Sequence, residues 1–102
     1  MIDFNLNTKC KIDYTSSFKK QLKKMLKQDK NIGELLLVIE KLANFEKLDS
    51  KYKNHSLIND KTYKDCFECH IRPDWLLIYK YDKEDKLILV LFATGSHSEL
   101  FK

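Results

Sequence analysis

Residues 75–94, WLLIYKYDKEDKLILVLFAT, determine the architecture on which the rest of the chain is built. Two apolar runs, 75–81 and 86–94, flank the acidic turn 82–85, which is the pattern of a β-hairpin. The second run is apolar at consecutive positions, so both of its faces should be buried, as in a central strand. We therefore expect two antiparallel strands in the middle of a sheet.

A third strand is expected just before this hairpin, over residues 62–71. One of its faces carries Phe67, Cys69 and Ile71, and the other carries Cys66, Glu68 and His70. Side chains alternate across a strand, so the two sets should point to opposite sides of the sheet. Pro73 cannot donate to a β-ladder and therefore indicates a turn before residue 75.

The N-terminal half predicts a short edge strand and two helices. Residues 9–14 alternate polar and apolar side chains, as an edge strand does. A cap among residues 15–17 then starts a helix, and a polar break at 28–31 separates it from a second helix that ends near Phe45. The apolar positions of the first helix are Phe18, Leu22, Met25 and Leu26, and those of the second are Ile32, Leu35, Leu36, Ile39, Leu42 and Ala43.

The order β-α-α-β-β-β predicts an α+β fold, in which a small antiparallel sheet carries a two-helix hairpin on one face. The length of 102 residues predicts one domain, spanning residues 1–102. The polar segment 48–61 is expected to form a long surface loop, and loops of that length often carry function.

The composition narrows the class of protein. Hydrophobic residues make up 43% of the chain and charged residues 33%, which is typical of a folded domain and not of a disordered one. No apolar run reaches the ~18 residues of a membrane-spanning helix, and residues 1–7 lack the pattern of a secretory signal. We therefore expect a cytoplasmic protein without membrane contact, in which the three cysteines are reduced thiols.

Positive charge is concentrated on the first helix, although the net charge of the chain is only +4. The lysines there are Lys19, Lys20, Lys23, Lys24 and Lys27. Such a surface attracts polyanions through phosphate contacts and counterion release, while a Lys-rich helix is as often merely solvated. Charge alone therefore leaves open whether these lysines contact RNA.

The segment 66–70, CFECH, matches the C-x-x-C-H pattern of haem attachment. In a strand, residues three apart face opposite sides, so the sulfurs of Cys66 and Cys69 should diverge. The segment also lacks the second ligand pair of a zinc site and the helix start of a redox motif. We therefore expect Cys69 in the core, and neither a metal nor a cofactor.

The three histidines are more informative. His55 lies in the polar loop, His70 on the polar face of a strand, and His97 at the end of the last strand. Strand ends and a crossing loop can converge, which would place the three imidazoles beside Glu68 and Asp74. With the basic helix and nearby aromatic residues, such a group suits RNA cleavage by 2′-OH attack, which needs a base, an acid and positive charge but no metal.

Three segments resemble the YafQ-type branch of the RelE superfamily, the toxins of bacterial type II toxin–antitoxin pairs. They are residues 53–57 (KNHSL), 69–80 (CHIRPDWLLIYK) and 94–101 (TGSHSELF). The resemblance implies the RelE-like fold and a ribosome-dependent mRNA endonuclease that leaves a cyclic phosphate. It also implies a cognate antitoxin, with operator DNA contacted only through that antitoxin, and ribosomal RNA as a partner of the basic helix.

The resemblance also implies roles for particular residues. The acid–base and phosphate-contacting positions of the family are matched by His55, His70, Asp74 and His97, of which His70 and His97 are predicted to be the acid–base partners. Trp75 and Phe101 match positions that shape the site or place the RNA, and Glu68 stands where the family often has Asp.

One position departs from the family. Where YafQ-type toxins carry Arg on the last strand, this chain has Ala93, and that Arg would stabilise charge on the reacting phosphate. We expect Arg72, Lys80 or protonated histidines to supply the charge. The alternative is a catalytically weak binding module of the same fold that acts with its antitoxin as a transcriptional co-repressor.

Overall fold

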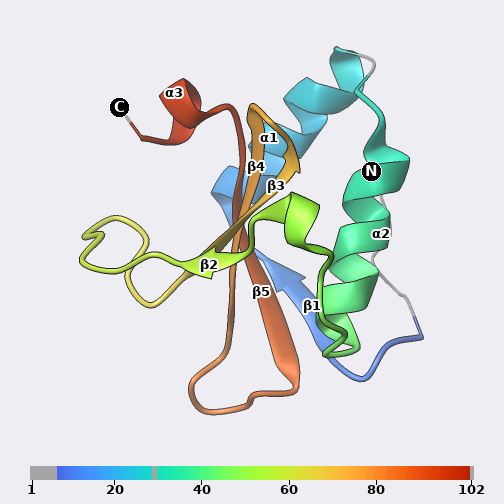
Figure 1. The fold of residues 1–102 in the computed structure, drawn as a ribbon, viewed down its shortest axis with the longest axis vertical. Coiled ribbons are helices and arrows are strands. Elements are labelled where there is room, and N and C mark those ends of the chain that lie inside the picture. Colours follow the sequence, from blue (N-terminus) through green and yellow to red (C-terminus); the bar gives the residue numbers. More distant parts are fainter. Residues whose placement is uncertain (1–6, 29, 102) are drawn as a thin grey trace.

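The predicted hairpin forms the interior of a mixed sheet (Figure 1). Strands β4 (Trp75–Tyr81) and β5 (Ile88–Gly95) pair antiparallel, and β3 (Phe67–Arg72) pairs antiparallel with the other edge of β4. The short strand β2 (His55–Ser56) extends the sheet beyond β3, and β1 (Lys11–Tyr14) lies on the far side of β5. The strand order in the described residues is β1-β5-β4-β3-β2.

The computed structural model describes residues 7–28 and 30–101. Residues 1–6, most of the segment that lacks a secretory-signal pattern, lie outside the described residues. So does Asp29, which belongs to the predicted break between the helices. No helix in the described part of the chain is long and apolar enough to cross a membrane.

The pairing of β1 with β5 is parallel, with Ile12 opposite Leu89, whereas we expected every strand pair to be antiparallel. An alternating hexapeptide indicates an edge strand but contains no information on its direction. The long connection from β1 through two helices permits either direction, and parallel pairing requires such a crossover. The sheet is therefore antiparallel from β5 to β2 and parallel at its β1 edge.

Two helices cover one face of the sheet and run in opposite directions, as predicted (Figure 1). Helix α1 (Ser16–Lys27) begins after Thr15, whose hydroxyl oxygen accepts the N–H of Phe18 at 3.1 Å. Helix α2 (Ile32–Ala43) begins after Asn31, whose side chain accepts the N–H of Gly33. These side-chain caps satisfy N–H groups that have no partner within the helix.

Helix α2 ends at Ala43, close to the predicted end near Phe45, where the backbone turns left-handed (φ 58°). One detail of the helices differs from the prediction. Leu26 is 40% exposed although its spacing predicted a buried position. A helix presents a stripe rather than half of its surface to the core, so the residue after Met25 falls outside the stripe.

The sheet separates two hydrophobic clusters. The larger cluster joins the helices to the sheet and includes Phe18, Leu22, Leu35, Ile39, Cys69, Leu77, Tyr79, Leu89 and Leu91. The smaller one lies on the opposite face and consists of Cys66, Leu76, Ile78, Ala93 and Leu100. The short helix α3 (His97–Leu100) and the loop before β3 cover only part of that second face (Figure 1), so the remainder is open for a site.

The segment before β3 is more structured than a plain loop. It contains a short 3-10 helix, η1 (Ser50–Tyr52), followed by β2. The predicted strand 62–71 begins only at Phe67, because Asp60 accepts the N–H groups of Thr62 and Tyr63 at 2.9 and 2.8 Å and bends the chain into a turn.

Candidate active site

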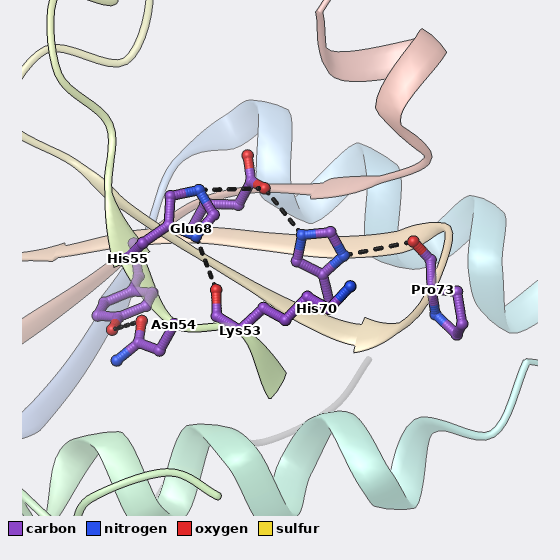
Figure 2. A network of polar contacts seen from close by, with 7 residues as sticks. Lys53, Asn54, His55, Glu68, His70 and Pro73 are labelled. Carbon is purple, nitrogen blue, oxygen red and sulfur yellow. Dashed lines mark hydrogen bonds and ion pairs between the residues drawn. The ribbon is translucent and has the colours of Figure 1, made fainter. Parts of the chain in front are cut away.

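Three polar side chains meet where β2 pairs with β3 (Figure 2). The register places His55 opposite Glu68, and His70 follows two residues later on the same face of β3. Glu68 Oε1 lies 3.1 Å from His70 Nε2 and 3.7 Å from His55 Nε2. The centroids of the two rings are 6.4 Å apart. The structure therefore brings these three predicted site residues together.

The other ring nitrogens face backbone carbonyls. His55 Nδ1 lies 2.7 Å from the carbonyl oxygen of Lys53, and His70 Nδ1 lies 3.3 Å from that of Pro73. A neutral imidazole donates from only one nitrogen. Both nitrogens of each ring lie near oxygen atoms, although the contact of His55 with Glu68, at 3.7 Å, is longer than a hydrogen bond.

The loop that carries His55 is fixed from behind. The hydroxyl of Tyr79, which is buried in the larger cluster, donates to Asn54 Oδ1 at 2.6 Å. Lys53 takes a left-handed conformation (φ 48°), which turns its carbonyl toward the His55 ring. His55 is therefore positioned by its backbone although half of its side-chain surface is exposed.

Asp74 and His97 form a second group at the end of the sheet. Asp74 Oδ1 accepts the backbone N–H of His97 at 3.1 Å, and the ring of Phe101 lies 5.0 Å from that of His97. Within residues 7–28 and 30–101, no hydrogen bond or ring contact joins His97 to His55 or His70. The structure thus places the predicted residues in two groups, whereas a single convergent cluster was expected.

Helix α3, which carries His97, is held by a reciprocal cap. Ser96 accepts the N–H of Glu99 through its hydroxyl oxygen, while its own N–H donates to the Glu99 carboxylate at 2.8 Å. Lys24 of α1 reaches the same carboxylate at 2.7 Å. The hydrogen bond from Lys24, followed by those from Ser96, lowers the pKa of Glu99 to about 2.

Trp75 supports the site from within the fold. Its indole N–H donates to Thr94 Oγ1 at 2.9 Å, and the Thr94 hydroxyl donates to the carbonyl of Leu76. Only 5% of Trp75 is exposed, so it links the start of β4 to the end of β5 rather than presenting its ring to solvent. Phe101 is half-buried against Tyr63 at 5.5 Å.

The predicted sources of positive charge lie in different places. Arg72 Nε is 2.8 Å from Glu34 of α2, so its guanidinium turns toward the helices. Lys80 Nζ lies 5.0 Å from the centre of the Phe92 ring. Ala93 is 2% exposed and packs in the smaller cluster, so it contributes a methyl group where the family has a cation.

The lysines of α1 border the second group. All five predicted RNA-contacting lysines (Lys19, Lys20, Lys23, Lys24 and Lys27) are exposed. A pocket of about 150 Å³ lies between α1 and the strand ends, and both Lys24 and Asp74 line it. Positive charge on α1 therefore extends to the carboxylate that binds the His97 backbone.

The cysteines separate as predicted. Cys69 lies in the larger cluster and Cys66 in the smaller one, on opposite faces of the sheet. Burial raises the pKa of Cys69 to about 12, which makes it an unreactive core side chain. Among the described residues, no group of three or more His, Cys, Asp or Glu side chains is arranged to hold a metal ion.

Sequence reasoning assigned no role to Lys53, although it lies in one of the segments that carried the family resemblance. Its left-handed backbone and its contact with His55 depend on the loop as a whole, and a lysine gives no signal for φ > 0. Its place two residues before His55 was the only available indication.

Comparisons with known proteins agree with this geometry. A family profile described as "Bacterial toxin of type II toxin-antitoxin system, YafQ" matches residues 10–102. The "mRNA interferase toxin YafQ" of Escherichia coli (strain B / BL21-DE3) is 36% identical over 91 residues, which cover 88% of this chain and 94% of that protein. The "Putative toxin YafQ" of Haemophilus influenzae is 31% identical over 87 residues, or 81% and 82% of the two chains.

Solved structures give the same result. A metal-bound toxin from Helicobacter pylori superposes with a TM-score of 0.81 at 39% identity, covering 90% of this chain and 99% of that one. The toxin of the Escherichia coli DinJ–YafQ complex gives 0.78 at 32% identity, covering 91% and 99%. The fold, the segments that carry the site and the match over residues 10–102 show that this chain belongs to the YafQ family of bacterial type II toxin–antitoxin toxins.

Proposed function

We propose that this protein is the toxin of a type II toxin–antitoxin pair and that it cleaves mRNA on the ribosome by metal-independent acid–base catalysis in the cytoplasm. The observation that carries the proposal is the placement of the His55 and His70 imidazoles beside the Glu68 carboxylate. The Escherichia coli relatives named mRNA interferase toxins support the choice of substrate.

The proposed reaction is attack of a ribose 2′-OH on the adjacent phosphorus. A base takes the 2′ proton as the O2′–P bond forms, and an acid protonates the 5′ oxygen as the P–O5′ bond breaks, which leaves a cyclic phosphate. We assign His70 and His97 as the acid–base partners. Asp74 and His55 orient or contact the substrate, and Glu68 holds the His70 ring.

Substrate contacts are assigned to the surrounding side chains. Phe101, beside the His97 ring, is proposed to place a base by stacking. Trp75 is proposed to shape the site through Thr94. Arg72 and Lys80 are proposed to supply positive charge to the phosphate, because Ala93 carries no charge.

The proposed protein partner is a cognate antitoxin. Operator DNA would be contacted by the antitoxin and not by this chain directly. Support comes from the Escherichia coli DinJ–YafQ complexes, whose toxin shares about a third of its sequence with this chain. The alternative function, a catalytically weak co-repressor module, is favoured by the apolar Ala93.

The test is induction of the wild type, His70→Ala and His97→Ala in bacteria, with cleavage of ribosome-bound mRNA measured in vitro. We expect growth arrest by the wild type only, and a loss of about 100-fold or more in cleavage rate in each variant. Excess EDTA, with magnesium restored before assay to keep the ribosomes intact, should leave cleavage unchanged. Lys61→Ala, an exposed lysine outside the site, should behave as wild type. Antitoxin binding without arrest by any form would support the co-repressor module.

A further inference from the structure

A pocket of about 330 Å³ opens beside His70, on the side away from Glu68. It is bordered by Lys51 and Lys53 from the loop before β2, by Arg72 from the end of β3, and by Glu34 from α2. His70 and Arg72 have roles in the proposed reaction, whereas Lys51 and Lys53 have none so far.

The pocket carries excess positive charge. Its single carboxylate, Glu34, already lies 2.8 Å from Arg72 Nε. Lys51 Nζ lies 5.1 Å from the centre of the Tyr52 ring. In the part of the chain that the structure describes, the Lys53 ammonium has no ion-pair partner. Two lysine charges therefore remain for an anion, and a concave site lined by one sign of charge concentrates the opposite sign.

Lys53 connects this pocket to the acid–base group. Its carbonyl oxygen accepts from His55 Nδ1 at 2.7 Å, while its side chain extends toward His70 (Figure 2). The left-handed backbone of Lys53 is uncommon for a residue with a Cβ. Backbone strain of this kind is kept where the surrounding structure requires a particular shape.

We propose that the pocket is a phosphate subsite for the RNA backbone, in which Lys53 is the principal ligand and Lys51 and Arg72 add charge. It would bind a phosphate next to the reacting linkage, because His70 forms its wall. The subsite would supply, from the loop, positive charge that the apolar Ala93 of β5 does not supply. The inference rests on the proposed function only in taking RNA as the ligand.

The experiment measures binding of a 2′-O-methyl RNA oligonucleotide, which lacks the nucleophile and cannot be cleaved. Lys53→Asn removes the ammonium while keeping a residue that tolerates the left-handed backbone. We expect several-fold weaker binding at low salt. The slope of log K against log salt should become shallower by about 0.7, the value for one lost phosphate contact on a single strand.

The matched control is Lys61→Asn, the same substitution at an exposed lysine that does not line the pocket. It should leave the salt slope unchanged. An unchanged slope in Lys53→Asn, or no binding by the wild type, would overturn the inference. So would a Lys53→Asn variant that loses affinity for the antitoxin alone, since the pocket would then take an acidic protein side chain. The RNA is uncleavable, so failure of the catalytic proposal would appear in the cleavage assay and not here.

Discussion

Glu68 controls where two of the three imidazoles point. Its side chain is 8% exposed, and its Oε1 faces both His55 and His70. His70 has a second anchor in the Pro73 carbonyl and is mostly buried, whereas half of the His55 side chain is exposed. The arrangement therefore depends on one carboxylate at the centre of the group.

Replacing Glu68 by Ala should misplace both rings and lower kcat by about 100-fold, the size of effect expected when a reacting group is poorly oriented. KM should change much less. The free energy of unfolding should fall by about 1 kcal/mol, the typical value of one hydrogen bond, because His70 loses its bond to Glu68 but keeps the Pro73 carbonyl. Steady-state kinetics and urea unfolding would measure both effects. Asp65→Ala removes a nearby exposed carboxylate and should leave kcat unchanged; equal losses in the two variants would exclude a specific role for Glu68.

Individual side chains show what could be predicted from sequence and what could not. Alternation along residues 66–71 correctly separated Cys66 from Cys69 and placed Glu68 with His70. The division of the site into two groups was not predictable, because it depends on where the end of β5 places His97 relative to β2 and β3. This position is a tertiary property, and no periodicity of the sequence indicates it.

Among the elements that carry the site, helix α3 depends most on contacts with the rest of the protein for its stability. Four residues are too few for a helix to persist alone, and sequence analysis did not predict it. Its signal was nonetheless present, because Ser96 followed three residues later by Glu99 is the pattern of a capping box. The direction of β1, by contrast, had no local signal.

Glu99→Gln should destabilise the protein in a pH-dependent way. The folded-state pKa of Glu99 is lowered from 4.5 to about 2, chiefly by Lys24, so its contribution is present above pH 4.5 and is lost as the pH falls toward 2. The Lys24 and Glu99 side chains are 60% and 46% exposed, which limits the effect to about 1 kcal/mol at neutral pH. Urea unfolding of both proteins between pH 7 and pH 3 would show the difference shrinking. A difference independent of pH would contradict this account, and Glu84→Gln on the β4–β5 hairpin serves as the control.

For the whole molecule, the distribution of charge determines which surface of the protein faces a polyanion. The exposed lysines of α1 lie on the outer surface of the helix layer, and Lys24 reaches the pocket that also contains Asp74. The positive surface and the group of Asp74 and His97 thus meet along one side of the molecule.

Reversing charge at Lys19, Lys20 and Lys23 should weaken ribosome binding by tenfold or more at low salt, with a shallower salt dependence. The three side chains are exposed, so the melting temperature should change little. Sedimentation with ribosomes at several salt concentrations would measure this. The same change at Lys9, Lys61 and Lys86 alters the net charge equally on other surfaces; an equal loss there would mean that net charge, and not the α1 surface, governs binding.

The parallel pairing of β1 with β5 has a consequence for the order of folding. Residues 11–14 pair with residues 88–91, far later in the chain, so the sheet closes through one of its longest loops, and closing such loops slows folding. His97 and its supporting helix follow that strand in the chain. The β1 edge of the sheet and the helix that carries His97 therefore both depend on β5, so slow closure of this long loop would delay the sheet and the His97 region together.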